Sequence, residues 1–167
     1  MSTPEADSSL FDDDRHINRF ITSATVITFV LATADLIFAC TYWHQLYGVP
    51  PSRLLQNIAS GLIGKRAFLG GMRTAQLGML LQYAMVSIMV ATYYAISSRF
   101  HALRQRPWFY GLLYGAVLYV TMNYIVLPLS AAPKSPFVPS WIACSIVVHL
   151  VFGITIAQGA RWATQKP

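Results

Sequence analysis

The sequence predicts an all-α polytopic membrane protein, a bundle of four transmembrane helices with an interfacial helix in the first outer loop. Three observations favour this fold class. Of the 167 residues, 55% are hydrophobic and only 11% are charged, whereas soluble domains average roughly 25% charged residues. Four apolar runs are long enough to cross a bilayer, which takes about 20 helical residues. Aromatic residues gather at the ends of these runs, as expected where a helix meets lipid headgroups.

The first fourteen residues are predicted to be an acidic, disordered tail. They hold five of the six acidic residues of the chain, and a segment of this kind buries too little apolar surface to fold. Because this start lacks the basic region of a signal peptide, the first apolar run is expected to remain as a span. The rest of the chain carries twelve basic residues and one acid, Asp35. These basic residues fall between the apolar runs, so we expect contacts with the lipid bilayer and no nucleic-acid partner.

The four spans are predicted at about residues 20–43, 75–97, 108–130 and 141–162 of a single domain that covers residues 15–167. Short connections predict that the second, third and fourth spans are antiparallel neighbours. Orientation follows from the Lys and Arg residues of the connections. The arginine-rich connection between spans two and three, together with both flanks, places seven basic residues on one side against five on the other. We therefore expect a bacterial inner-membrane protein with both termini cytoplasmic.

The connection between the first two spans is predicted to hold the short interfacial helix. Two prolines precede Ser52, which is a suitable N-cap. Apolar residues then recur at helical spacing on one face, while polar residues occupy the other; the apolar set is Leu54, Leu55, Ile58 and Leu62, and the polar set is Arg53, Gln56, Asn57 and Ser60. This two-sided pattern is typical of a helix that lies at a membrane surface.

The segment after this helix, ASGLIGKRAFLGG, combines glycines with basic residues. Lys65, Arg66 and the nearby Arg73 are therefore candidate contacts to an anion or to lipid headgroups. The GxxGK spacing lacks the four intervening residues and the following Ser or Thr of a phosphate-binding P-loop. A tight turn whose basic residues meet lipid headgroups is the favoured interpretation.

Each predicted span places one polar residue at a similar depth from the outer side. Asp35 lies about eight residues from the outer end of its span, or roughly 12 Å deep at 1.5 Å per residue. Gln82, Asn123 and His149 lie at comparable depths in the other three spans. If these side chains face inward, they form one intramembrane polar cluster. A hydrogen-bonded layer that holds the helices together is the first interpretation. The alternative is a proton or substrate site that uses the Asp35 carboxylate and the imidazole of His149.

Small residues and prolines mark further points of close packing. Gly111 and Gly115 form a GxxxG motif in span three, and Gly153 and Ala157 form a related pattern in span four. Such motifs allow close helix approach, either within the bundle or between copies of the chain. Pro128 is expected to kink or end span three.

The two cysteines and the histidines give no further chemistry. Cys40 and Cys144 lie at similar depths, so a disulfide requires spans one and four to be neighbours; unpaired apolar packing is preferred. Only one histidine lies deep in a span, so haem is not expected, nor is any other cofactor or metal. No hydrolase, kinase or metalloprotease pattern is present, and an enzyme is not expected.

Several stretches resemble a family of small four-span bacterial inner-membrane proteins classed as a domain of unknown function. They are ASGLIGKRAFLGG, PWFYGLLYGAVLYVTMNYIVLPLSAAP and HLVFGITIA, with Met122, Asn123 and residues 127–130 as the most specific part. The resemblance covers residues 20–160. It implies the four-span fold and a bacterial origin, and it implies no catalytic residues.

Two functions follow as expectations. The first is an accessory or interaction protein that packs against itself, as a homo-oligomer, or against a larger membrane complex; small size and the GxxxG motif favour it. The second is a small oligomeric transporter or channel subunit that uses the intramembrane Asp and His layer.

Overall fold

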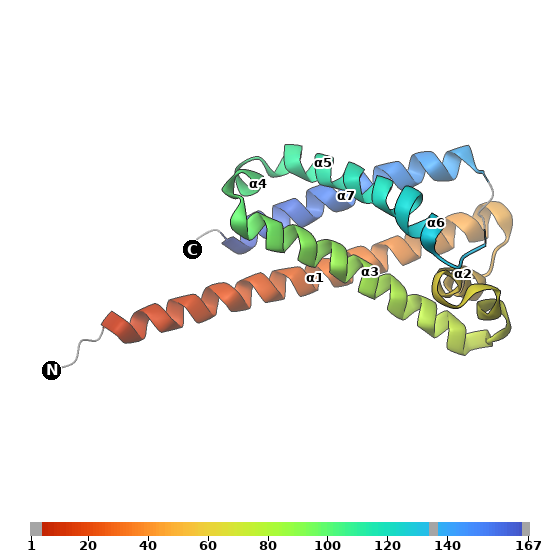
Figure 1. Ribbon diagram of the computed structural model, residues 1–167, viewed down its shortest axis with the longest axis horizontal. Helices are drawn as coiled ribbons and strands as arrows, with labels where there is room; N and C mark the ends of the chain where they lie inside the picture. Colours follow the sequence, from red (N-terminus) through yellow and green to blue (C-terminus); the bar gives the residue numbers. More distant parts are fainter. Residues whose placement is uncertain (1–4, 134–136, 165–167) are drawn as a thin grey trace.

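The computed structural model describes residues 5–133 and 137–164, and within these residues it is helical with no strand (Figure 1). Four stretches are long and apolar enough to cross a membrane: Ile17–Tyr47, Gly71–Arg99, Pro107–Leu129 and Pro139–Thr164. They overlap the four predicted spans, so the prediction of an all-helical chain with four membrane-spanning candidates is confirmed. These helices are compatible with an integral membrane protein.

The helices follow one another in a simple order. Span one belongs to α1 (Glu5–Tyr47), and span two is α3 (Gly71–Arg99). Span three consists of α5 (Pro107–Val120), the π-helix η2 (Thr121–Val126) and the short α6 (Leu127–Leu129). Span four is α7 (Pro139–Thr164). Three short helices lie in the connections: α2 (Pro51–Ile63), the 3-10 helix η1 (Gly64–Leu69) and α4 (His101–Gln105).

The helix α1 begins much earlier than its predicted span. It starts at Glu5, so residues 5–14, which we expected in a disordered tail, are helical in the structure. Neither glycine nor proline interrupts the chain between Glu5 and the span. Acidic residues also favour the first turns of a helix, where the helix dipole is positive. Residues 1–4 of the predicted tail lie outside the described residues.

The bundle has two different ends. We call the end with α2, η1 and the α6–α7 connection the α2 end, and the opposite end, with α4, the α4 end (Figure 1). Helix α5 packs along α7, and α1 packs against both α7 and α3. Figure 1 shows α3 and the third span close together at the α4 end and apart at the α2 end. Spans two and three, which we expected to be antiparallel neighbours, therefore lie close together only towards the α4 end.

Glycines set the close contact between α5 and α7. A Cβ atom on Gly111 would lie 2.7 Å from Ile154 Cα, and one on Gly115 would lie 2.7 Å from Leu150 Cα. On the facing helix, a Cβ on Gly153 would lie 2.7 Å from Gly115 Cα. These distances are below ordinary carbon–carbon contact. The GxxxG motif thus acts within the bundle, which is one of the two alternatives that the sequence left open.

Helix α2 lies across the direction of the spans and is viewed nearly end-on in Figure 1. Its packing face differs from the prediction. Gln56, Ala59 and Ser60 are buried, whereas the side chain of Leu62 is 62% exposed. The reason is that α2 rests on α3 at Gly78, where Leu55 O takes the space of a Cβ. Such a close approach favours small side chains and internally bonded polar ones on the buried face.

Candidate functional site

Two adjoining cavities open in the half of the bundle nearer the α2 end. Their volumes are about 480 Å³ and about 280 Å³. All four polar residues that the sequence analysis placed in one layer line the smaller cavity: Asp35 from α1, Gln82 from α3, Asn123 from η2 and His149 from α7. Three of them, Asp35, Gln82 and His149, also line the larger cavity. The structure thus brings the four side chains together around open space.

The Asp35 carboxylate and the Gln82 amide join spans one and two inside the bundle. Gln82 Nε2 donates a hydrogen bond of 2.5 Å to Asp35 Oδ2. Gln82 is buried and Asp35 is half-buried, in a part of the chain where an unpaired charge would be costly. A charge-assisted bond of this kind is stronger than a neutral one, so it holds α1 against α3 at this depth.

The imidazole of His149 lies across the cavity from this pair. Its Nδ1 is 2.8 Å from Ser145 O, one turn earlier on α7. A carbonyl oxygen only accepts hydrogen bonds, so Nδ1 carries the proton in the neutral ring and Nε2 holds the lone pair. The ring packs edge-on against Tyr119, with centroids 5.6 Å apart.

The π-helix η2 places Asn123 at the smaller cavity. Leu127 N donates to Met122 O, five residues back, which is the hydrogen bond that defines a π-turn. The cause lies at Pro128, which has no N–H and whose ring would crowd the carbonyl of Tyr124 in an ordinary helix. The helix widens before Pro128 and ends at Leu129, so the expected disturbance of span three takes the form of a π segment. Asn123 Nδ2 donates to Tyr119 O at 3.0 Å.

Aromatic side chains form the wall of the larger cavity at the α2 end. Trp141 of α7 stacks on Phe38 with centroids 6.1 Å apart and packs against Trp43 at 5.4 Å. Tyr42 lies beside Trp141 at 5.0 Å, and its hydroxyl is 2.7 Å from Ser140 Oγ. This wall fixes the α2 ends of α1 and α7 relative to each other.

Helix α2 covers the cavities from the side of the loops. Leu54, Asn57 and Ile58 line the larger cavity, and Asn57 and Ile58 also line the smaller one. Arg53 is exposed and lines only the larger cavity, with its guanidinium 4.0 Å from the centre of the Phe68 ring. Arg53, whose guanidinium packs on an aromatic ring, therefore lies at the rim of the larger cavity. It is separate from the inner polar group, which consists of Asp35, Gln82, Asn123 and His149.

The half of the bundle nearer the α4 end is closed by tight packing. Tyr93, Tyr94 and Ile156 are almost fully buried there. Ser23 Oγ lies 2.8 Å from the Tyr94 hydroxyl and 3.3 Å from Gly159 O, so one hydroxyl joins α1, α3 and α7. On this side the cavities thus end at a closely packed core.

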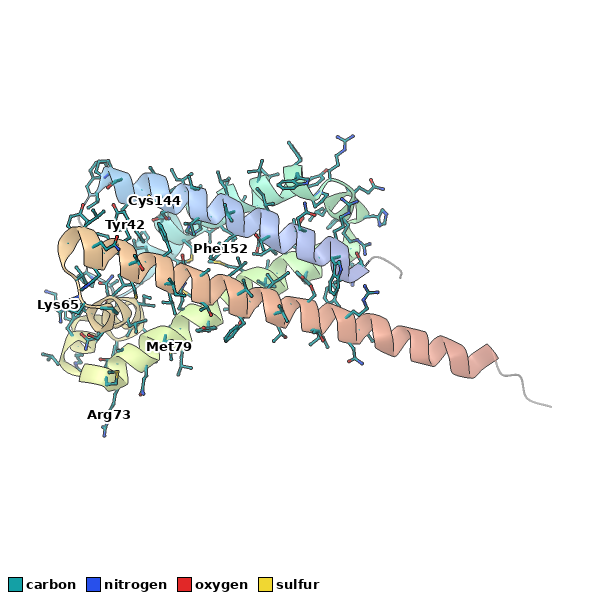
Figure 2. All side chains as sticks on the ribbon, turned by 180° about the vertical axis from the view of Figure 1, so that it is seen from behind. Tyr42, Lys65, Arg73, Met79, Cys144 and Phe152 are labelled. Carbon is teal, nitrogen blue, oxygen red and sulfur yellow. The ribbon has the colours of Figure 1, made fainter. Side chains whose placement is uncertain are left out.

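The candidate anion or headgroup contacts Lys65, Arg66 and Arg73 line neither cavity. Lys65, Arg66 and Arg73 are all exposed, and Figure 2 shows Lys65 and Arg73 pointing away from the bundle at its α2 end. Cys40 and Cys144 are both free cysteines. The described residues contain no group of three or more His, Cys, Asp or Glu side chains that would hold a metal ion.

Several lining residues were not singled out from the sequence. On α7 they are Trp141 and Ser145, which lie eight and four residues before His149 on the same helix face, and Val148, which is its immediate neighbour. On α1, Phe38 and Ala39 follow Asp35 at spacings of three and four. Residues three and four apart share a helix face, so these neighbours could have been predicted from the positions of Asp35 and His149. The lining residues of α2 could not, because we expected the polar face of this helix to contact water.

Neither a family model, nor a curated protein, nor a solved structure matches this chain. The resemblance to small four-span bacterial inner-membrane proteins therefore stays a prediction. The cavities and their lining are the features of the protein that bear on its function.

Proposed function

We propose that this protein is a bacterial inner-membrane subunit of a small oligomeric transporter or channel, which binds its solute in the cavities lined by Asp35, Gln82, Asn123 and His149. One observation supports it above all: the four polar side chains from four spans surround open space of several hundred Å³. A layer that served only to hold helices together would fill that space with its own hydrogen bonds.

The proposed orientation places the α2 end on the outer side and both termini in the cytoplasm. The excess of basic residues at the α4 end, in the α3–α5 connection and at both flanks, supports it. In this orientation the cavities face outward, and the core around Tyr93, Tyr94 and Ile156 closes the cytoplasmic half. A transporter must also reach a state in which the same site opens inward. Four spans enclose little space beyond these cavities, so we expect an oligomer to complete the pathway.

An accessory or interaction protein remains the other candidate. Large apolar side chains are exposed along all four spans, but contact with lipid accounts for them. Contact with lipid does not account for the polar lining of the cavities, and this lining favours the transporter or channel.

The test is thiol labelling from each side of the membrane. Ser145, which lines both cavities, is replaced by cysteine in a Cys40→Ala, Cys144→Ala background. The matched control is Val147→Cys, two residues along the same helix on a side chain that is 59% exposed and faces away. A membrane-impermeant methanethiosulfonate is applied to right-side-out and to inside-out vesicles, and labelling rates are compared.

We expect Ser145→Cys to react from the outer side and more slowly from the inner side, while Val147→Cys stays unreactive in lipid. Reaction from both sides supports alternating access. Reaction from the outer side alone contradicts transport and leaves a binding or interaction protein. No reaction from either side shows a sealed polar layer and overturns the proposal.

A further inference from the structure

The unused hydrogen-bonding atoms of the inner polar group are mostly acceptors. The structure gives Gln82 and Asn123 one bond each through their amide nitrogens, and His149 one bond through Nδ1. Four acceptor atoms have no hydrogen-bond partner among the described residues: Asp35 Oδ1, Gln82 Oε1, Asn123 Oδ1 and His149 Nε2. Against these, each amide keeps one further N–H donor.

The residues that carry these acceptors all line the smaller cavity. Among the described residues, the only fully buried side-chain polar atom without a partner is Nε of Arg104, at the far end of the molecule. The four unbonded acceptors are therefore not fully buried. Unpaired acceptors beside a negative charge attract a ligand that brings both positive charge and N–H donors.

The walls of the cavities suit an organic cation better than a bare metal ion. Phe38, Trp43, Phe68 and Trp141 line the larger cavity, and aromatic faces attract organic cations. A volume of about 480 Å³ lies within the range of small-molecule sites. Of the described His, Cys, Asp and Glu side chains, only Asp35 and His149 line the cavities.

We propose that the cavities bind an amphipathic organic cation, a protonated amine with an aromatic or aliphatic body, whose ammonium group donates to Asp35 and His149. This inference rests on the proposed function and names its class of substrate. The ammonium replaces the missing donors at the inner group, and the apolar body lies against the aromatic wall. Arg53 lies at the rim of the larger cavity only, and its guanidinium is held over Phe68.

The experiment measures protection of Ser145→Cys from the same thiol reagent, with the protein in lipid nanodiscs. Three probes share one ring and a short chain but differ in charge: 2-phenylethylammonium, 2-phenylethanol and 3-phenylpropionate. We expect the ammonium to protect the cysteine at a concentration at least about tenfold below that of the alcohol. This ratio corresponds to the free energy of one charge-assisted hydrogen bond. We expect no protection by the carboxylate. Val147→Cys reports any effect of the probes on the lipid.

Two variants assign the effect to residues. Asp35→Asn should raise the protecting concentration of the ammonium about tenfold or more, whereas Asp35→Glu should keep it within a few-fold.

Equal protection by all three probes, or best protection by the carboxylate, overturns the inference. If Asp35→Asn does not fold, the probe series with Asp35 intact still decides charge selectivity. The two proposals fail separately. An unreactive Ser145→Cys removes the water-accessible cavity, while a reactive cysteine without charge-selective protection removes only the organic cation.

Discussion

Replacement of Gly153 by alanine should weaken the packing of α5 on α7. In the structure, a Cβ atom at this position would lie 2.7 Å from Gly115 Cα and even closer to the backbone of Gly111. These neighbours are main-chain atoms of a regular helix, which cannot rotate aside as a side chain would. The helices must therefore move apart to admit one methyl group.

The expected change in stability is the cost of separating the two helices, reduced by the higher helix propensity of alanine. Restoring an ordinary carbon–carbon contact of about 3.5–4.0 Å requires the helices to separate by about 1 Å, which forfeits roughly a quarter to a half of the dispersion energy at this contact. Overpacking of this kind costs about 1–3 kcal/mol. Alanine gains about 0.5–1 kcal/mol over glycine as a helix former. The net expectation is a loss of about 1–2 kcal/mol in the free energy of unfolding.

The assay is reversible unfolding by sodium dodecyl sulfate in mixed micelles, followed by far-ultraviolet circular dichroism. The matched control is Gly61→Ala in α2, where a Cβ would meet only Ser130 atoms at 3.8 and 4.0 Å. This control keeps the helix-forming gain without the clash, so it should be equal to the parent protein or more stable by up to about 1 kcal/mol. If Gly153→Ala proves as stable as Gly61→Ala, then α5 and α7 do not meet at this turn and the packing argument is wrong.

Three further outcomes are expected. Gln82→Leu removes the donor to Asp35 and should lower the free energy of unfolding by about 1–3 kcal/mol, whereas Gln76→Leu, on an exposed side chain of the same helix, should change it little; equal effects would show that the amide bond does not hold α1 to α3. Tyr94→Phe removes the hydroxyl contact with α1 and should cost about 1 kcal/mol in the same assay, while Tyr124→Phe, at a side chain that is 70% exposed, should be neutral. Both native cysteines are free, so alkylation of the denatured protein without reductant should add two groups by mass spectrometry; an unmodified mass after full denaturation would reveal a disulfide.

The spans were predictable because membrane insertion leaves a strong signal in composition. A helix in lipid must satisfy its backbone internally and present apolar side chains all round, so span length and position can be read without knowledge of neighbours. The convergence of the four polar residues was also foreseeable, because depth follows from residue counting at 1.5 Å per residue. Their rotation toward one cavity was not fixed by depth, and it came from the structure.

Other features were hidden because they depend on contacts between distant segments. Gln56 and Ser60 looked solvent-facing on α2, and only the approach to Gly78 explains their burial. The sequence indicated a disturbance near Pro128 but not its form as a π-helix, which depends on how the freed backbone groups find partners. The divergence of α3 from span three at the α2 end, which creates the smaller cavity, has no local sequence signal.

The π segment also makes the lining of this cavity sensitive to the insertion or deletion of a single residue in the third span. A π-turn is equivalent to an α-helix that has accepted one extra residue, and one residue turns a helix by about 100°. Deletion of Thr121 or Met122 would therefore turn Asn123 by about 100° away from the cavity, while the α5–α7 contact at Gly111 and Gly115 stays in register. Insertions and deletions in this one turn thus offer a route to relatives with the same membrane fold and a different lining on the third span.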